Sequence, residues 1–244
     1  MPQWSEQTLA SFERKAKETK VAVMVTGSIE AHGDHLPLGC DLILPTFLAE
    51  RIAQKTKALV LPPIPFGESW PMDVFKGTVS LRAGTLLMVY HDVMKAVFRH
   101  GFRFILALNG HGLNTPLLRQ AAEEATEGTD GTVIIVDWWS DLAKSVRAQV
   151  LESPEGHAGE DETSEVLAVR PDLVDMKVAK GARVRTAFRV VSASHREELL
   201  PRGVYGEPEG ATAEKGKAIM KKAEEELLLL VEQLEQGKLP ITEK

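Results

Sequence analysis

The chain has 244 residues, of which 43% are hydrophobic and 26% are charged, a balance that excludes disordered and fibrous proteins. Its length is compatible with one large α/β domain, so we expect residues 1–244 to form a single domain. The formal net charge of -6 argues against nucleic acid as a partner and favours a small-molecule substrate.

Signals for export or membrane insertion are missing from the sequence. The single cysteine, Cys40, cannot form an intrachain disulfide, which fits a reducing compartment. Residues 1–18 are charged and contain no apolar core of a signal peptide. The sequence has no apolar run of the roughly 18 residues that a membrane helix needs. We therefore expect a cytoplasmic protein with no membrane partner.

Apolar runs and helical patterns alternate along the chain. Residues 21–25 form an apolar run that ends at Thr26 and Gly27, which is typical of a buried parallel strand. The next segment, which begins at Pro45, has helical spacing, and proline suits the first helical position. The alternation continues with a strand in residues 58–67, a helix in 84–101, a strand in 102–110, a helix in 115–126 and a strand in 131–139.

Two further segments complete the predicted fold. Residues 182–194 have the pattern of a strand at a sheet edge, and residues 211–236 that of a long amphipathic helix. Strands that alternate with helices predict a parallel sheet with helices on both faces. Ligands of such sheets bind outside the carboxyl ends of the strands.

Three glycine-containing loops carry an excess of histidine and carboxylate side chains. Residues 27–41 read GSIEAHGDHLPLGCD, residues 108–114 read LNGHGLN, and residues 156–164 read GHAGEDETS. Glycine lets the backbone turn sharply and approach a ligand closely. The first two loops follow predicted strands, so their side chains are expected at the ligand-binding edge of the sheet.

Mixed Glu, His and Asp ligands suit Zn, Mn or Fe. Glu30 and His32 could each serve one of two ions, and Asp41 has two oxygens with which it could bridge them. Two ions about 3.5–4 Å apart can hold a hydroxide and polarise a carbonyl together, which favours hydrolysis of an amide or related C–N bond. Purely structural roles stay open: Asp41 could cap the helix near Pro45, and His111 could be a hydrogen-bonded loop histidine.

The same three loops resemble signatures of the creatininase (creatinine amidohydrolase) family, namely G-S-x-E-x-H-G-x-H-L-P-x-x-x-D, N-G-H-G-x-N and H-A-G-x-x-E-T-S. The resemblance implies a three-layer α/β/α sandwich with a mostly parallel central sheet, assembled as a homohexamer. It also implies a binuclear metal site that hydrolyses cyclic or formyl amides with a metal-bound hydroxide. By position, Glu30 and His111 would bind one ion, His32 the other, and Asp41 both, while His157 would be a proton donor or oxyanion partner.

One position departs from this pattern. Creatininase itself has an acidic metal ligand two residues after the histidine of the second signature, where this chain has Leu113. We predict that Glu160 replaces it as a metal ligand and catalytic residue, with Glu162 as its competitor. The departure leaves the substrate open among creatinine-like rings, a formylaminopyrimidine nucleotide of flavin or deazaflavin synthesis, and a peptide precursor of a redox cofactor.

Other interpretations of the sequence are weaker. A non-catalytic α/β assembly subunit is disfavoured because Glu30, His32, Asp41 and His111 are all retained, and a serine hydrolase lacks its G-x-S-x-G elbow here. Trp138 and Trp139 could stack on a flat substrate or belong to the core. Trp70 could lie in a lid or a subunit contact.

Overall fold

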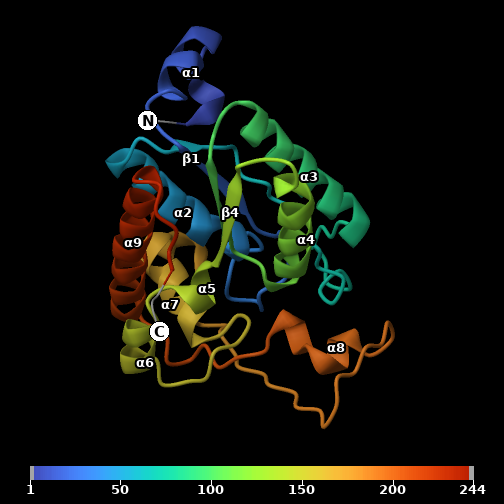
Figure 1. Cartoon of the computed structure of the whole chain (residues 1–244). Coiled ribbons are helices and arrows are strands. Elements are labelled where there is room, and N and C mark those ends of the chain that lie inside the picture. Colours follow the sequence, from blue (N-terminus) through green and yellow to red (C-terminus); the bar gives the residue numbers. More distant parts are fainter. Residues whose placement is uncertain (1–2, 242–244) are drawn as a thin grey trace.

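A four-stranded parallel sheet with the order β2-β1-β3-β4 forms the centre of the computed structural model, which describes residues 3–241 (Figure 1). All six residues of the first strand are buried, as expected for a sheet covered on both faces. The register pairs Thr26 with Asn109 and Asn109 with Asp137, so three polar side chains stand side by side where their strands end. The strands are β1 (Val21–Thr26), β2 (Leu59–Val60), β3 (Phe104–Asn109) and β4 (Thr132–Asp137).

Two layers of helices sandwich this sheet. On one face α2 (Cys40–Lys55), α7 (Glu160–Val169) and α9 (Ala213–Glu235) belong to the core that contains Val21, Val23 and Val25. On the other face α3 (Ala83–Arg99) and α4 (Thr115–Thr126) pack against Ala22 and Met24 (Figure 1). Alternate residues of β1 thus enter two separate cores, and the predicted α/β/α sandwich is confirmed.

Shorter helices connect the main elements. Across residues 3–241, no helix combines the length and the apolar character needed to cross a membrane. The short α-helices are α1 (Leu9–Lys15), α5 (Trp138–Asp141), α6 (Lys144–Val150) and α8 (Arg196–Leu199), and the 3-10 helices are Trp4–Glu6, Gly112–Asn114, Pro171–Leu173 and Pro201–Gly203.

The structure corrects two predicted boundaries. The helix expected to begin at Pro45 begins at Cys40, so Asp41 lies in its first turn and Pro45 lies inside it. The strand expected in residues 58–67 is only Leu59–Val60, because the adjacent prolines cannot donate ladder hydrogen bonds.

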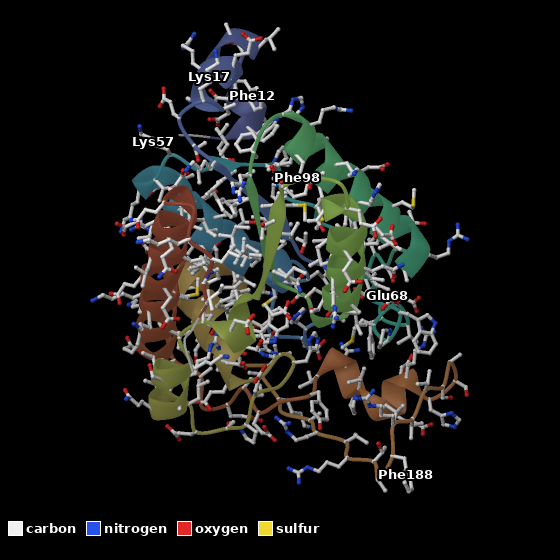
Figure 2. All side chains as sticks on the ribbon, in the orientation of Figure 1. Phe12, Lys17, Lys57, Glu68, Phe98 and Phe188 are labelled. Atoms are coloured by element: carbon white, nitrogen blue, oxygen red, sulfur yellow. The ribbon has the colours of Figure 1, made fainter. Side chains whose placement is uncertain are left out.

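The predicted edge strand in residues 182–194 is wrong. Within this described segment only Ala182 makes a bridge, to Gly206, and the rest is an exposed excursion that leads to α8. Phe188 is 84% exposed and projects away from the sheet (Figure 2). The β-branched residues here follow the composition of a strand, but within residues 3–241 those after Ala182 pair with no strand.

Candidate metal centre

Four buried side chains converge at the carboxyl edge of the sheet. Glu30 and His32 come from the loop after β1, Asp41 from the first turn of α2, and His111 from the loop after β3. His32 Nε2 lies 2.9 Å from Asp41 Oδ1, and His111 Nδ1 lies 2.9 Å from Asp41 Oδ2. His111 Nδ1 is also 3.4 Å from Glu30 Oε1. The two oxygens of Asp41 therefore face two different imidazoles, the arrangement that the predicted bridge between two ions would require.

Each histidine of the cluster is oriented by a backbone carbonyl. His32 Nδ1 donates to Glu30 O at 3.1 Å, and His111 Nε2 donates to Glu68 O at 2.7 Å. Because a carbonyl only accepts hydrogen bonds, these contacts place the proton of each neutral ring on the outer nitrogen. The other nitrogen then directs its lone pair at the carboxylates, the arrangement typical of metal-binding histidines.

Glycines allow Asp41 to approach both loops. A Cβ on Gly110 would lie 1.9 Å from Asp41 O, and one on Gly27 would lie 2.4 Å from the same oxygen. Both distances are far below van der Waals contact, so these positions require glycine. Pro45, four residues after Asp41, has no N–H to donate to that carbonyl, which leaves the carbonyl free to face the glycines.

The electrostatics of the cluster favour added positive charge. Burial opposes ionisation of Asp41, but the nearby His32 and His111 hold the pKa of its carboxyl below the usual value. Burial likewise disfavours a charged His32, yet the Asp41 carboxylate raises the pKa of His32 to about 10. The pKa of His111 is also raised, against burial, by Glu30 and Asp41. Buried carboxylates of this kind need a cation, which protons on the imidazoles or metal ions can supply.

The donor set fits divalent metal ions. Glu30, Asp41 and His111 present one ligand atom each within 4.8 Å of one another, and Glu30, His32 and His157 form a second such group. Glu30 Oε2 is buried and has no hydrogen-bond partner among the described residues, and His32 Nε2 faces only carboxylate oxygens, those of Asp41 and Glu162. A buried carboxylate oxygen without a partner, next to an imidazole nitrogen that faces carboxylates, is what a bound ion would satisfy.

The third loop brings His157 and Glu162 to the same cluster. The ring of His157 lies 4.1 Å from that of His32, centroid to centroid, and its Nε2 donates to Ala31 O at 2.9 Å. Its other nitrogen, Nδ1, faces Glu30 Oε1 at 3.8 Å. Glu162 Oε2 lies 3.9 Å from His32 Nε2 and accepts a hydrogen bond from Ala158 N at 2.6 Å.

Glu160 does not join them, contrary to expectation. Its Oε1 lies 2.6 Å from Lys215 Nζ, and its Oε2 accepts hydrogen bonds from the backbone N–H groups of Glu152 and Ser153. This carboxylate is thus already satisfied on the side of α7 that faces Lys215 of α9. Of the two glutamates considered from the sequence, it is Glu162 that the fold brings to His32.

Comparison with known proteins identifies the family. A family model described as creatinine amidohydrolase (Creatininase) matches residues 5–231. The chain belongs to the creatininase family. The creatinine amidohydrolase of Pseudomonas putida is 32% identical over 190 residues, which are 70% of this chain and 73% of that protein. A mycofactocin precursor peptide peptidase of Mycobacterium ulcerans is 28% identical over 206 residues, which are 79% of this chain and 77% of that protein.

Solved creatininase structures share the fold. A crystal structure of creatinine amidohydrolase (creatininase) superposes with a TM-score of 0.86 at 26% identity, covering 98% of both chains. A manganese form matches with a TM-score of 0.85 and a zinc–zinc form of a mutant with 0.84, each at 26% identity and covering 96% of this chain and 98% of that chain. The family thus includes proteins that hold divalent metals on this fold.

Several residues of this creatininase-family member support the centre without having been predicted. Asn109 donates to His111 O and to Asp137 Oδ1, both at 2.8 Å, and Asn114 donates to Gly27 O at 3.1 Å. Asn114 thus ties the loop after β3 to the loop after β1, and Asn109 ties it to the end of β4. The two asparagines stand in the NGHGLN signature, but their partners Asp137 and Gly27 lie far away in sequence. His35, in the loop after β1, places its Nε2 3.0 Å from Thr163 Oγ1 of α7 and so connects that loop to the helix.

The remaining candidates divide between core and pocket. Trp138 is buried beneath the guanidinium of Arg147, 5.1 Å from the ring, which agrees with the core role. Trp70 lines a pocket next to the centre, described below. Cys40 is buried, and burial raises the pKa of its thiol, so the reactive thiolate is disfavoured.

Proposed function

We propose that this protein is a metal-dependent amidohydrolase with two divalent ions at the described centre. The observation that carries the proposal is the convergence of three histidines, each with one N–H fixed to a backbone carbonyl and the other nitrogen turned toward buried carboxylates. Relatives whose names describe amide or peptide hydrolysis support the same class of reaction.

In this proposal Glu30, Asp41 and His111 hold one ion, and His32, Asp41 and Glu162 hold the second. Glu162 takes the ligand role that was expected of Glu160. It thereby supplies the carboxylate that creatininase itself has at the position of Leu113. The distances that favour this assignment are 3.9 Å from Glu162 to His32 and 2.6 Å from Glu160 to Lys215. When bound, two divalent ions lower the pKa of a water molecule and polarise a carbonyl.

The other groups of the chain manage protons and orientation. His157 keeps its Nε2 proton on Ala31 O, which leaves Nδ1 as the atom that faces the centre near Glu30. Nδ1 is placed to take up a proton and to pass it to the departing nitrogen of an amide, the role of a general acid. The half-buried position of His157, at the edge of the buried cluster, suits a group that meets the substrate.

A reconstituted hydrolysis screen tests the proposal. Protein purified without chelator is loaded with Zn, Mn or Fe and assayed on creatinine, formylaminopyrimidines, hydantoin-like rings and short peptides. We expect hydrolysis in at least one class, its loss with chelator and its recovery with metal. Two outcomes contradict the proposal. One is hydrolysis that continues unchanged when chelator is added, and the other is that the metal-loaded protein hydrolyses no substrate of any class.

A further inference from the structure

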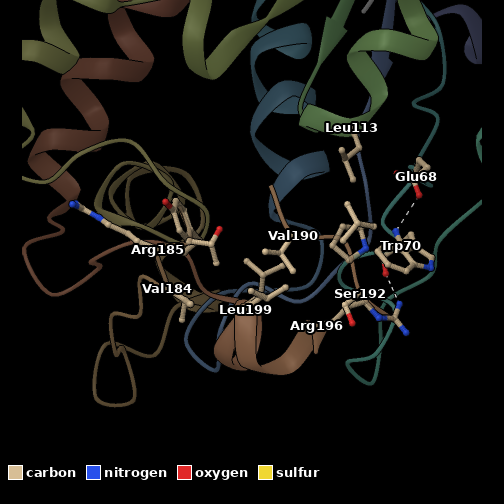
Figure 3. Close-up of a pocket in the computed structure, with 14 residues that line it drawn as sticks. Glu68, Trp70, Leu113, Val184, Arg185, Val190, Ser192, Arg196 and Leu199 are labelled. Carbon is tan, nitrogen blue, oxygen red and sulfur yellow. Dashed lines mark hydrogen bonds between the residues drawn. The ribbon is translucent and has the colours of Figure 1, made fainter. Parts of the chain in front are cut away.

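A pocket with a volume of about 670 Å³ opens beside the metal centre. We call it the side pocket. It lies between the segment around Glu68 and Trp70 and the excursion that contains residues 184–200 (Figure 3). Its size falls in the range of small-molecule sites in proteins. Its apolar wall includes Trp70, Leu113, Val190, Val191, Leu199 and Tyr205.

Three chain connections join the side pocket to the metal centre. Glu68 lines the pocket, and its carbonyl accepts the hydrogen bond of His111 Nε2. Leu113 also lines it and follows His111 by two residues. Tyr205 pairs through its backbone with His157, with N–O distances of 2.8 and 2.9 Å. A substrate amide held at the centre therefore has the side pocket next to it.

The charged groups of the side pocket are already occupied or directed outward. Arg196 bonds to Asp73 and to Trp70 O, and its guanidinium stacks 4.7 Å from the Trp70 ring. The Glu68 carboxylate accepts a hydrogen bond from Trp70 N at 3.2 Å. Arg185 lies at the edge opposite Trp70, and its guanidinium points away from Val190 and Leu199 (Figure 3). What remains toward the interior is mainly aliphatic and aromatic.

From this we infer that the side pocket receives an apolar group of the substrate, so that the enzyme acts on amides bearing a sizeable aliphatic or aromatic substituent. The inference rests on the proposed function and adds its substrate class. Leu113 contributes in two ways. It stands where creatininase itself has an acidic metal ligand, and it supplies apolar surface where the metal centre meets the side pocket. A phenyl-sized group buries enough apolar surface in such a pocket to favour its substrate at least about tenfold.

Paired substrates of one amide class test this inference. N-benzylformamide is compared with N-methylformamide, and 5-benzylhydantoin with hydantoin, using metal-loaded protein. We expect kcat/KM to be at least about tenfold higher for the benzyl member of the pair that is cleaved. Binding of N-benzylformamide to metal-free protein, followed by tryptophan fluorescence with Trp70→Phe as reference, gives a readout that does not depend on hydrolysis.

Two matched valine variants locate the effect. Val190 lines the side pocket and is 50% exposed, whereas Val178 is 46% exposed and is not among the residues lining it. Val190→Asp places a carboxylate in the pocket and should abolish most of the preference for the benzyl substrate. Val178→Asp should leave that preference unchanged.

The outcomes separate the two proposals. Equal rates for paired substrates, with no effect of Val190→Asp, overturn the side-pocket inference and leave the proposed function intact. If N-benzylformamide binds metal-free protein in a Val190-dependent way but no amide is hydrolysed after metal loading, the proposed function fails instead. If Val190→Asp lowers the solution mass and the paired rates are equal, the surface belongs to a contact with a second copy, and the inference is overturned.

Discussion

Asp41 is the residue on which the proposed centre depends most. Its two oxygens each lie 2.9 Å from a different histidine, so it is the natural bridge between two ions. We expect Asp41→Ala and His111→Ala each to lower turnover at least about a thousandfold, and the double variant to be hardly worse, because such ligands act as a unit. Turnover and circular dichroism check this. Retention of a third of wild-type turnover by Asp41→Ala shows that Asp41 is not the bridge.

The two glutamates of α7 allow a direct comparison. We expect Glu162→Gln to lose one metal ion per chain and most activity. Glu160→Gln should keep metal content but lose stability, by roughly 1–3 kcal/mol, because Lys215 and two backbone N–H groups lose a charged partner. Elemental analysis and thermal unfolding of both variants distinguish them. If Glu160→Gln loses a metal ion and Glu162→Gln does not, Glu160 is the metal ligand.

Much of this residue set was predictable, and the exception has a geometric cause. Glu30, His32, Asp41, His111 and His157 stand in loops whose signatures are visible in sequence, and the fold brings all five together. The choice between Glu160 and Glu162 depended on helical phase. Residues two apart on a helix point about 200° apart, so only one can face the centre. That phase is set by the preceding turn, where Ala158 has a φ of 53°, which no pattern in the sequence announces.

At the scale of elements, the predictable parts were those with strong periodicity. The continuous apolar runs of β1 and β3 and the amphipathic pattern of α9 identified the sandwich. The start of α2 was misplaced because Pro45 is favoured at a first turn, while here the loop after β1 folds into helix five residues earlier. The prediction of a strand in residues 182–194 failed because β-branched composition leads to a strand only where a partner strand is available for pairing.

A buried carboxyl group on α7, which lies beside Arg147 of α6, predicts a pH dependence of stability. Glu165 is fully buried, and burial raises its pKa from 4.5 to about 8 although Arg147 Nη1 lies 2.8 Å from its Oε1. The folded state then holds a proton that the unfolded state releases, so stability falls as pH rises from about 4.5 through 8. Glu165→Gln should flatten this fall, because a glutamine amide does not ionise in this range.

Unfolding in urea at several pH values, with wild type beside Glu165→Gln, measures the difference. Glu225→Gln, a change at an exposed position of α9, is the control and should keep the wild-type slope. Parallel pH profiles for wild type and Glu165→Gln would show that Glu165 is ionised in the folded protein throughout this range.

For the whole molecule, family membership leads us to expect a homohexamer. Light scattering at micromolar concentration should then give a mass near six times the 26.8 kDa of one chain. Closed symmetric assemblies are the usual form of such oligomers. A mass close to that of one chain would contradict the prediction.

Metal binding should stabilise the whole fold, because the centre ties together segments that are distant in sequence. The groups come from the loop after β1, the start of α2, the loop after β3 and the third loop. At a free metal concentration about 100 times Kd, binding adds about 2.7 kcal/mol, or roughly 5–10 °C in Tm for a chain of this size. Calorimetry of metal-loaded and chelator-treated protein measures this shift.

The size of that shift should grow with pH. In metal-free protein the buried carboxylates are balanced by protonated imidazoles, and the pKa of His32 is raised from 6.5 to about 10. A histidine whose pKa is raised in the folded state contributes its full stabilisation below about pH 6.5. That contribution is lost as the pH rises toward 10. Metal-loaded protein does not depend on those protons, so the gap in Tm should widen from pH 6.5 to 9. Asp41→Ala should show almost no difference in Tm between metal-loaded and metal-free protein. If the wild-type difference stays constant or narrows as pH rises, protonated His32 does not compensate the charge of the carboxylates.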